Sequence, residues 1–280
     1  MTDLTVIIVN WNTRRLLHGC LTSVFRHTSG ISCQVTVVDN ASSDGSPDMV
    51  AKAFPDVRLI RNQENLGFSR ANNQALCSAS SRYFLLLNSD TALQDNAFKE
   101  IVAFMDAHSN AGISGTRLLN SDGSRQYSCD LFPRRPLTIL FDKIRDRFFP
   151  SLSGGWQDRM SAWDFRQDFL VDYVIGAVLC IRRETFEQIG LLDERFFMYA
   201  EDIDWCFRAA RAGWQTYYLG SISISHYNRG SSQKTPGQAL RLQQMRTHSL
   251  RKFYRKHYGL LDSVLFSLIV CLKKNHSNEC

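Results

Sequence analysis

Three polar residues, Asn88, Ser89 and Asp90, directly follow a run of five large apolar residues, Tyr83 to Leu87. Such a run is typical of a strand that is buried on both faces of a parallel sheet. Ligands of open α/β sheets bind beyond the carboxyl ends of these strands, and a carboxylate placed there can hold a divalent cation. The sequence therefore predicts that Asp90 lies at a cation and diphosphate site, although Asn, Ser and Asp are also ordinary turn residues.

A second cluster with potential chemistry consists of Glu201, Asp202 and Asp204, which crowd the first turn of a predicted helix. The apolar positions Ile203 and Phe207 mark the buried stripe of that helix. The helix dipole favours acids in a first turn, but three acids within four positions exceed what capping requires. Like charges at this spacing raise one another's pKa, an arrangement common where a general base is tuned.

The elements that must position these residues can be read from the apolar patterns of the N-terminal part. Three strands and three helices alternate before the Tyr83 run, at residues 5–9, 13–28, 34–38, 47–54, 57–61 and 71–80. This order predicts a doubly wound parallel sheet with right-handed crossovers. Each strand ends in a polar cluster, so one pocket could collect Asn10, Asp39, Asn65 and Asp90.

Asp39 follows the second strand and could accept a hydrogen bond from a ribose hydroxyl or a base N–H, or could cap a turn. The chain has no G-x-G-x-x-G after its first strand and no G-x-x-x-x-G-K-[ST] motif. A dinucleotide-binding fold and a P-loop are therefore not supported.

The second half of the chain contains further strands. Val171 to Ile181 reads as one buried strand interrupted by Gly176-Ala177, where a backbone or a ligand could approach closely. Trp214 to Leu219 and Ser221 to Ser225 read as two short strands that end at His226. Residues 130–169 fit either an acceptor loop or an ordinary surface excursion.

The C-terminal part combines basic stretches with one apolar run. Residues 229–280 carry ten Lys or Arg and two acids, a net charge of +8, which leaves −2 for residues 1–228. Ala239 to Tyr258 is helical in pattern, and the apolar run Leu260 to Leu272 is too short to span a bilayer. Its basic flanks favour an anionic membrane surface, while a helix docked on the body or a dimer contact are the alternatives. Nucleic acid is not expected as a partner, because the basic region carries this apolar segment.

The whole chain of 280 residues has the composition of a soluble globular protein. No signal peptide and no spanning segment are expected. The eight cysteines include no C-x-x-C pair, which indicates a reducing compartment, and we expect a cytoplasmic protein that is peripheral at the inner face of the cell membrane.

Four stretches in order carry a resemblance to a known family: VIIVNWN, VVDNASSDGS, Asn65 to Phe68 with Arg70 close behind, and LLLNSD. Together they resemble the nucleotide-binding half of glycosyltransferase family 2, in its bacterial rhamnosyltransferase-like branch. The resemblance implies a GT-A fold, which is a Rossmann-like, mostly parallel sheet flanked by helices, here with a basic and apolar helical tail. It also implies Mg²⁺ or Mn²⁺ bound by the last Asp of a D-x-D motif, which is Asp90. Asn88 stands at the first position of that motif, so that only Asp90 supplies charge.

The resemblance extends to individual site residues. It implies that Asp202 is the general base, that Glu201 positions the acceptor or donor sugar, and that Asp204 braces the helix. It further implies that His226 completes the metal site. The residues predicted to bind the donor nucleotide are Asn10, Asp39, Asn65, Gly67, Arg70, Asn88 and Arg229. The residues predicted beside the acceptor are Gly176, Ala177 and Trp205.

The resemblance implies an inverting, metal-dependent transfer of a sugar, rhamnose from its thymidine diphosphate donor, to a hydroxyl of a lipid-linked cell-surface glycan. A hexosyl or galactofuranosyl transferase with a uridine donor, or a non-catalytic nucleotide- or glycan-binding paralogue, are the alternatives. Residues 1–118 are expected to form the nucleotide-sugar half and 119–232 the acceptor half of one domain, followed by the helical tail 233–280. The sequence does not indicate an oligomeric state.

Overall fold

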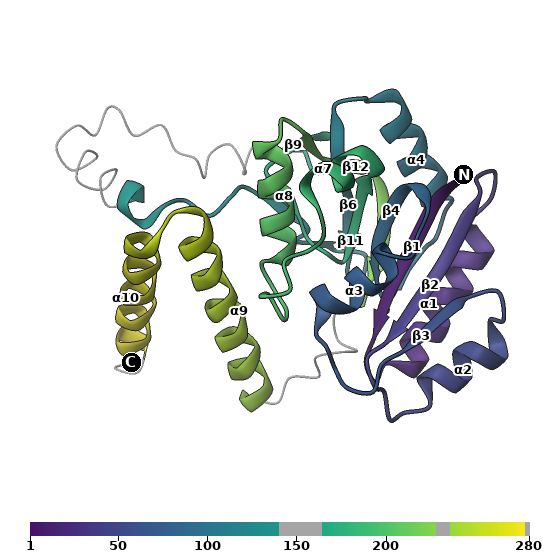
Figure 1. Cartoon of the computed structure of the whole chain (residues 1–280), viewed down its shortest axis with the longest axis horizontal. Coiled ribbons are helices and arrows are strands. Elements are labelled where there is room, and N and C mark those ends of the chain that lie inside the picture. Colours follow the sequence, from purple (N-terminus) through teal and green to yellow (C-terminus); the bar gives the residue numbers. More distant parts are fainter. Residues whose placement is uncertain (140–163, 228–235, 278–280) are drawn as a thin grey trace.

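A computed structural model of the chain describes residues 1–139, 164–227 and 236–277, which form a mixed α/β structure with a two-helix extension (Figure 1). Its central sheet has ten strands, in the order β3-β2-β1-β4-β11-β6-β12-β5, with β7 beside β6 and β9 beside β12. The longest pairings in this sheet, those of β1 with β2, β1 with β4 and β6 with β12, are parallel. The predicted GT-A architecture is confirmed.

The N-terminal part has the predicted alternation of strands and helices. Its elements are β1 (Thr2–Asn10), α1 (Arg14–His27), β2 (Cys33–Asp39), α2 (Ser46–Ala53), β3 (Arg58–Arg61), α3 (Phe68–Leu76) and β4 (Ser81–Asn88). In the register of the sheet, Asn10 lies opposite Asp39 and Val9 lies opposite Asn88. The carboxyl ends of β1, β2 and β4 are therefore level, which places the polar residues that follow them at one edge.

The second half of the chain makes the sheet mixed. It contains β5 (Thr91–Ala92), α4 (Ala97–Ala107), β6 (Ala111–Leu119), β7 (Arg125–Gln126), β8 (Cys129–Asp130), β9 (Phe169–Val171), β10 (Tyr173–Val174), β11 (Val178–Arg182), α7 (Arg183–Ile189), α8 (Glu201–Arg211) and β12 (Gln215–His226). Strand β11 runs antiparallel between β4 and β6 and so joins the two halves into one sheet.

Two predicted strand assignments in this half are wrong in detail. The stretch from Val171 to Ile181 is divided among β9, β10 and β11, which pair with different partners. The two short strands predicted after Trp214 form the single strand β12, whose register against β6 shifts between Leu219 and Ser223. Gly220 lies in that irregularity, where an added Cβ would come within 2.2 Å of the carbonyl oxygen of Gln167. Gly220, which lies between the two predicted strands, thus permits a close backbone approach.

The apolar run of β4 is buried on both faces, as its composition predicts. Tyr83, Leu85 and Leu87 belong to the core on one face of the sheet, together with residues of α1 and α4. Phe84 and Leu86 belong to the core on the opposite face, with residues of α3 and α8. Alternation along a strand thus distributes consecutive apolar side chains between two helical layers. Four of the seven described cysteines, all of them free thiols, are buried in the same way.

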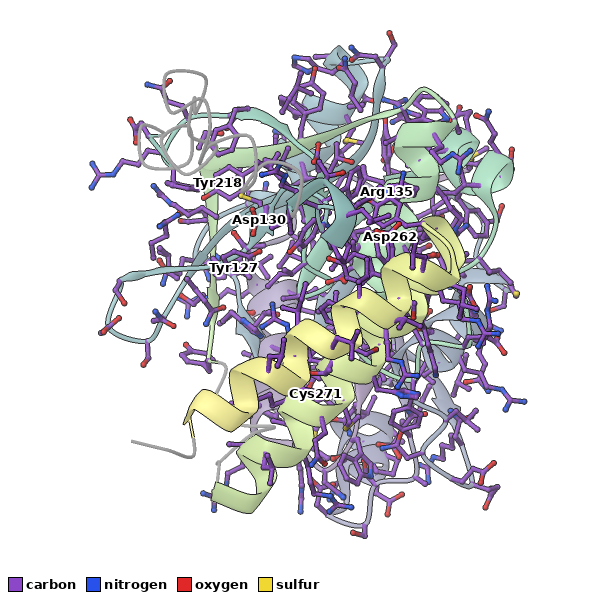
Figure 2. All side chains as sticks on the ribbon, turned by 90° about the vertical axis from the view of Figure 1, so that its left-hand side faces the viewer. Tyr127, Asp130, Arg135, Tyr218, Asp262 and Cys271 are labelled. Carbon is purple, nitrogen blue, oxygen red and sulfur yellow. The ribbon has the colours of Figure 1, made fainter. Side chains whose placement is uncertain are left out.

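The C-terminal helices α9 (Pro236–His257) and α10 (Leu260–Ser277) form a hairpin at the side of the sheet, with α10 outermost (Figures 1 and 2). Gly259, at φ +95°, makes the turn between them. Phe253 of α9 is fully buried in the core that also contains residues of α8. Among the described residues, no helix has the length and apolar character needed to cross a membrane.

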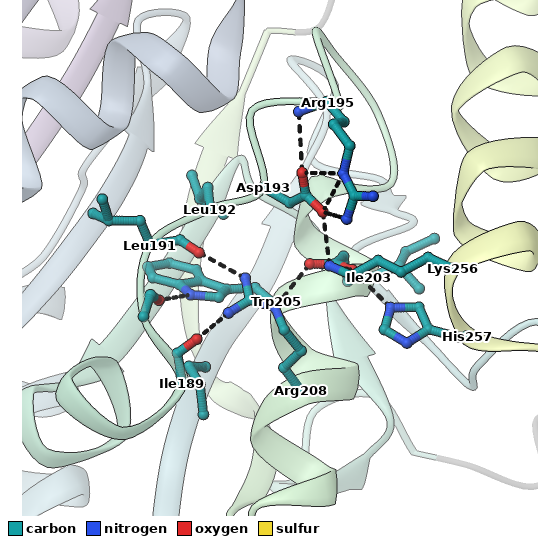
Figure 3. A network of polar contacts seen from close by, with 12 residues as sticks. Ile189, Leu191, Leu192, Asp193, Arg195, Ile203, Trp205, Arg208, Lys256 and His257 are labelled. Carbon is teal, nitrogen blue, oxygen red and sulfur yellow. Dashed lines mark hydrogen bonds and ion pairs between the residues drawn. The ribbon is translucent and has the colours of Figure 1, made fainter.

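A buried ionic network fastens α9 to the start of α8 (Figure 3). Asp204, whose side chain is 0% exposed, accepts bonds from Arg208 Nε at 2.9 Å, Lys256 Nζ at 2.6 Å and His257 Nε2 at 2.7 Å. Lys256 also contacts Asp193 at 2.8 Å. Burial alone would raise the pKa of Asp204, but the bonds from His257 and Lys256 and the charge of Arg208 hold it below the ordinary value. The expected bracing role of Asp204 thus has a structural basis.

We predict that Asp204→Asn lowers the free energy of unfolding by about 3–5 kcal/mol, because it leaves the partly buried Arg208 and Lys256 without their fully buried counter-charge. Urea denaturation measures this change. Asp48→Asn is the matched control. Asp48 is 80% exposed and its ion-pair partner Arg61 is 48% exposed, so this pair should contribute less than about 1 kcal/mol to the free energy of unfolding.

The same pair of proteins gives a pH test. Because the pKa of Asp204 is lowered, its carboxylate stabilises the fold above the ordinary value of 3.8, and this contribution is lost as the pH falls through the folded-state pKa. The difference in the free energy of unfolding between the wild type and Asp204→Asn should therefore become smaller in acid. Equal losses for Asp204→Asn and Asp48→Asn, or a difference that widens in acid, would contradict the assignment.

Candidate active site

The first pole of the site is a carboxylate and an imidazole at the ends of two strands. Strand β5 pairs antiparallel with the end of β12, so that His226 lies opposite Thr91. This pairing brings Asp90 Oδ1 to 3.1 Å from His226 Nε2, with both side chains almost fully buried. The backbone fixes the arrangement further, since the N–H of Tyr227 donates to the carbonyl of Asp90 at 2.8 Å. The sequence predicted both residues for one site, and the structure brings them together.

The other ring nitrogen of His226 indicates how the imidazole is oriented. His226 Nδ1 lies 2.5 Å from Gln126 Oε1, and the amide nitrogen of Gln126 donates to Asn120 Oδ1 at 3.0 Å. The amide oxygen can only accept, so Nδ1 carries the proton of this bond, and Nε2 is the ring nitrogen that faces Asp90. A ring nitrogen held in this way by an amide or carboxylate is the usual state of a metal-ligating histidine.

This donor set fits a divalent cation. Asp90 Oδ1 and His226 Nε2 are both electron-pair donors when the histidine is neutral, and at 3.1 Å they require either a shared proton or a cation. Carboxylate and imidazole are ligands found at Mn²⁺ and other divalent ions. Asn88 Nδ2 lies 3.3 Å from His226 Nε2. Within residues 1–139, 164–227 and 236–277, no third Asp, Glu, His or Cys joins this pair.

The predicted nucleotide residues Asn10 and Asp39 are joined directly. Asn10 Nδ2 donates to Asp39 Oδ1 at 2.8 Å, and the backbone N–H of Ser42 donates to Asp39 Oδ2 at 2.9 Å. Thr13 Oγ1 donates to Asn10 Oδ1 at 2.6 Å and lies 2.9 Å from the hydroxyl of Ser89. A continuous chain of hydrogen bonds therefore connects Asp39 with the residue that precedes Asp90. Asn10 is fully buried and its amide positions Asp39, so its own contact with the nucleotide stays a prediction.

The loop before α3 lies beside the same edge. Asn65 Oδ1 accepts from the N–H of Gly67 at 3.0 Å, and Asn40, next to Asp39, donates to the carbonyl of Gly67 at 3.1 Å. Gly67 has φ +82°, and an added Cβ would lie 2.6 Å from the carbonyl oxygen of Phe197. Only glycine fits this position. Arg70 is more than half exposed and is 3.8 Å from Glu194, so its guanidinium remains accessible to a ligand.

The second pole is the start of α8. Tyr199 and Ala200 both have positive φ, at 69° and 65°, and this uncommon backbone leads the chain into the helix at Glu201. Asp202 Oδ2 accepts from the N–H of Gly176 at 3.0 Å, and Oδ1 accepts from the N–H of Ile203 at 2.8 Å. The carboxylate of Asp202 is therefore held in place by two backbone groups.

The three acids of this turn have different environments. Burial, and then the charge of Asp202, raise the pKa of Glu201 well above its ordinary value. Among the described residues, none forms a hydrogen bond with the buried Oε2 of Glu201. Burial also raises the pKa of Asp202, while the bonds from Gly176 and Ile203 act in the opposite sense. Asp204 has its own cations and remains charged. The arrangement favours a proton on Glu201 and an ionised Asp202 with elevated basicity.

One dipeptide, Gly176-Ala177, connects the two poles. The N–H of Asn88 donates to the carbonyl of Ala177 at 2.9 Å, and the N–H of Gly176 donates to Asp202. An added Cβ on Gly176 would lie 3.2 Å from the ring of Phe68 and 3.9 Å from Cβ of Asp202. The groups that approach this glycine are side chains, so the approach of a backbone or a ligand there stays a prediction.

The loop that opens α8 is also fastened to the donor half of the domain. The N–H of Phe68 donates to the carbonyl of Phe197 at 2.7 Å, and Ser69 Oγ donates to the carbonyl of Phe196 at 2.6 Å. Asn73 exchanges two bonds with the backbone of Leu192, at 2.9 and 3.1 Å. Helix α3 thereby fixes the position from which α8 starts.

Two predicted site residues do not take part in the described site. Trp205 is 0% exposed and donates its indole N–H to the carbonyl of Gly190 at 2.9 Å, so the expected contact with an acceptor is wrong. It packs in the apolar core with Ile203 and Cys206 of the same helix. Arg229 lies outside the described residues. The roles of Thr13 and Gln126 were not predicted, because each depends on a contact with a distant strand end.

Comparisons with known proteins identify the family of this chain. The model of the family described as "Glycosyl transferase family 2" matches residues 5–161. An N-acetylglucosaminyl-diphospho-decaprenol L-rhamnosyltransferase of Mycobacterium tuberculosis is 27% identical, over 86% of this chain and 81% of that protein. A dTDP-rhamnosyl transferase of Shigella flexneri, RfbF, is 22% identical over 98% of this chain and 81% of its own length.

A solved structure supports the fold independently. The mannosyltransferase of Pyrobaculum calidifontis, in complex with GDP-Man and Mn²⁺, superposes with a TM-score of 0.61 at 18% identity, over 91% of this chain and 66% of its own. With a family model that covers more than half of its residues, this chain belongs to glycosyl transferase family 2, as a rhamnosyltransferase-like glycosyltransferase of GT-A fold.

Proposed function

We propose that this enzyme transfers a sugar, rhamnose from dTDP-rhamnose, to a hydroxyl of a lipid-linked cell-surface glycan, with inversion at the anomeric carbon. The observation that carries the proposal is a pair of hydrogen bonds made by Gly176-Ala177. The carbonyl of Ala177 bonds to Asn88, in the turn that contains Asp90, and the N–H of Gly176 bonds to Asp202. It fixes a candidate cation site and a candidate base on either side of one dipeptide. The names of the relatives support the sugar and the lipid-linked acceptor.

In this proposal Asp202 removes the proton of the acceptor hydroxyl while that oxygen attacks the anomeric carbon. The bond between this carbon and the diphosphate oxygen breaks on the opposite face, and the nucleoside diphosphate departs. A single displacement of this kind inverts the configuration. The elevated basicity of Asp202 suits it to the task, because a base is most effective when its pKa approaches the working pH. A protonated Glu201 would donate a hydrogen bond to the acceptor or to the donor sugar.

Asp90 and His226 are the residues that would hold Mg²⁺ or Mn²⁺, beside Asn88. Such an ion would supply positive charge to the diphosphate of the donor as it leaves. Asp39, Asn65, Gly67 and Arg70 are proposed to bind the nucleotide, and Arg229 is proposed as a further diphosphate contact. Gly176 and Ala177 are proposed to lie beside the acceptor.

The first test concerns the donor. With Mn²⁺ present, dTDP-rhamnose should raise the melting temperature of the protein more than UDP-glucose, UDP-galactofuranose or GDP-mannose do, because at equal concentration the ligand that binds more tightly stabilises the folded state more. A protein protected only by a UDP-sugar would instead be a hexosyl or galactofuranosyl transferase. Protection by no nucleotide sugar would contradict the proposal.

The second test concerns the base. Asp202→Asn should lower the rate of transfer by at least about a hundredfold, while thermal protection by the donor stays unchanged, since general-base catalysis contributes about 10²–10⁴. Glu100→Gln, which changes an acid in the first turn of α4, is the matched control and should retain full activity.

The pH profile gives a further readout on Asp202. Because its pKa is raised, transfer should decline in acid at a pH above the ordinary aspartate value of 3.8. Full turnover by Asp202→Asn would refute the base assignment. A rate that stays level down to pH values near 4 would do the same.

The third test concerns the cation. Asn88→Asp places a second carboxylate next to Asp90 and should lower the Mn²⁺ concentration needed for half-maximal protection by dTDP about tenfold, because affinity rises with the number of charged ligands. Asp90→Asn should abolish the Mn²⁺ dependence of that protection. If both variants need the same Mn²⁺ concentration for protection by dTDP as the wild type, the ion does not bind at Asp90.

A further inference from the structure

Helix α10 presents an apolar face on which no other described element packs. Its large apolar side chains there are between 38% and 65% exposed, and they are Leu260, Leu261, Val264, Leu268, Ile269 and Leu272. At about 100° per residue these positions fall within one half of the helix circumference. Residues 260–272 include a single charged residue, Asp262, which is buried on the opposite side. Contiguous exposed apolar surface of this kind marks an interaction site.

The opposite face of α10 is fastened, so the orientation of the apolar face is fixed. Asp262 accepts from Arg135 Nε at 2.9 Å and Nη2 at 2.8 Å (Figure 2). Ser263 Oγ donates to the carbonyl of Arg251 in α9 at 3.1 Å, and the ring of Phe266 stacks on Tyr254 with centroids 4.7 Å apart. These contacts turn the apolar side chains away from α9, and Figure 2 shows α10 outermost on this side of the molecule.

The charge of the hairpin indicates which partner fits. Helix α9 contains no Asp or Glu along its 22 residues, and Arg241, Arg251 and Arg255 are exposed on it. Lys273 and Lys274 follow the apolar run of α10. The region 229–280 has a net charge of +8, against −2 for the rest of the chain. An apolar helix face among cations suits an anionic lipid surface, whereas two copies of this chain would bring two such charges together.

We propose that the exposed face of α10 inserts into the interface of a membrane that contains anionic lipids. The apolar run of residues 260–272 is about 20 Å long as a helix, against a hydrocarbon core of about 30 Å, so it lies in the interface. The biological role of this membrane contact rests on the proposed function, in which a lipid-linked acceptor resides in the same membrane.

The hairpin also connects that surface to the catalytic helix. Ser249 of α9 donates to the carbonyl of Met198 at 2.7 Å, just before the turn that opens α8. Lys256 and His257 bond to Asp204 inside α8. A hairpin bound to a membrane through α10 would therefore set the distance of Asp202 from the lipid surface.

The test is flotation of the full-length protein with phosphatidylcholine vesicles, with and without phosphatidylglycerol. The wild type should bind the mixed vesicles more tightly than pure phosphatidylcholine. Leu261→Gln combined with Leu268→Gln should weaken binding at least about tenfold, because these leucines lose their transfer into the interface. Arg251→Gln combined with Arg255→Gln should weaken binding to the mixed vesicles several-fold and leave binding to pure phosphatidylcholine unchanged.

Leu170→Gln is the matched control, since Leu170 of β9 is 50% exposed and lies outside the hairpin. It should bind vesicles like the wild type. Equal flotation of the leucine double variant and the wild type would overturn the proposal, as would no flotation of the wild type. A dimer in sedimentation that dissociates in the leucine double variant would also overturn it and assign the face to a second copy.

The same preparations separate this inference from the proposed function. Vesicle binding that depends on Leu261 and Leu268, with no thermal protection by any nucleotide sugar, would support the membrane surface and contradict the transferase assignment. Thermal protection by dTDP-rhamnose without vesicle binding would support the transferase assignment and contradict the membrane surface.

Discussion

The site depends on two backbone hydrogen bonds made by one dipeptide. The carbonyl of Ala177 accepts from Asn88, and the N–H of Gly176 donates to Asp202. Side chains at these positions could be exchanged in evolution, but the amide groups are present in every sequence, so the geometry of the site is set by the course of the chain. Gly176 permits that course, because a larger residue would press on Phe68. Donor and acceptor sides are thus held at one separation by the link between β10 and β11.

The acid turn of α8 shows how a fold can place three carboxylates together and give each a different charge state. Asp204 is neutralised by cations from α8 and α9, so it does not compete for the proton of the turn. Glu201 finds no partner for Oε2 in the part of the chain that the structure describes, and burial favours its neutral form. Asp202 retains backbone donors that stabilise its charge. The C-terminal hairpin therefore contributes to the acid–base properties of the site as well as to its stability.

The sequence predicted those features that depend on local patterns. The alternation of strands and helices up to β4 and the polar edge at Asn10, Asp39 and Asp90 follow from periodicity and from the rule that parallel strands end together. His226 was placed near Asp90 only through a family resemblance, since 136 positions separate them. Contacts such as Gln126 with His226 could not be predicted, because they depend on the register of β12 against β5 and β6. Trp205 was assigned wrongly, because its neighbours in sequence were acids while its position on the helix was buried.

The central claim is that a cation held by Asp90 and His226 faces Asp202 across the bound sugar. Anomalous diffraction at the manganese edge, from crystals grown with Mn²⁺ and dTDP, tests it most directly. We expect a single strong manganese peak in contact with Asp90 and His226 and next to the diphosphate, with the carboxylate of Asp202 facing the same nucleotide. A manganese peak away from Asp90, or a nucleotide bound on a face from which Asp202 cannot be reached, would contradict it.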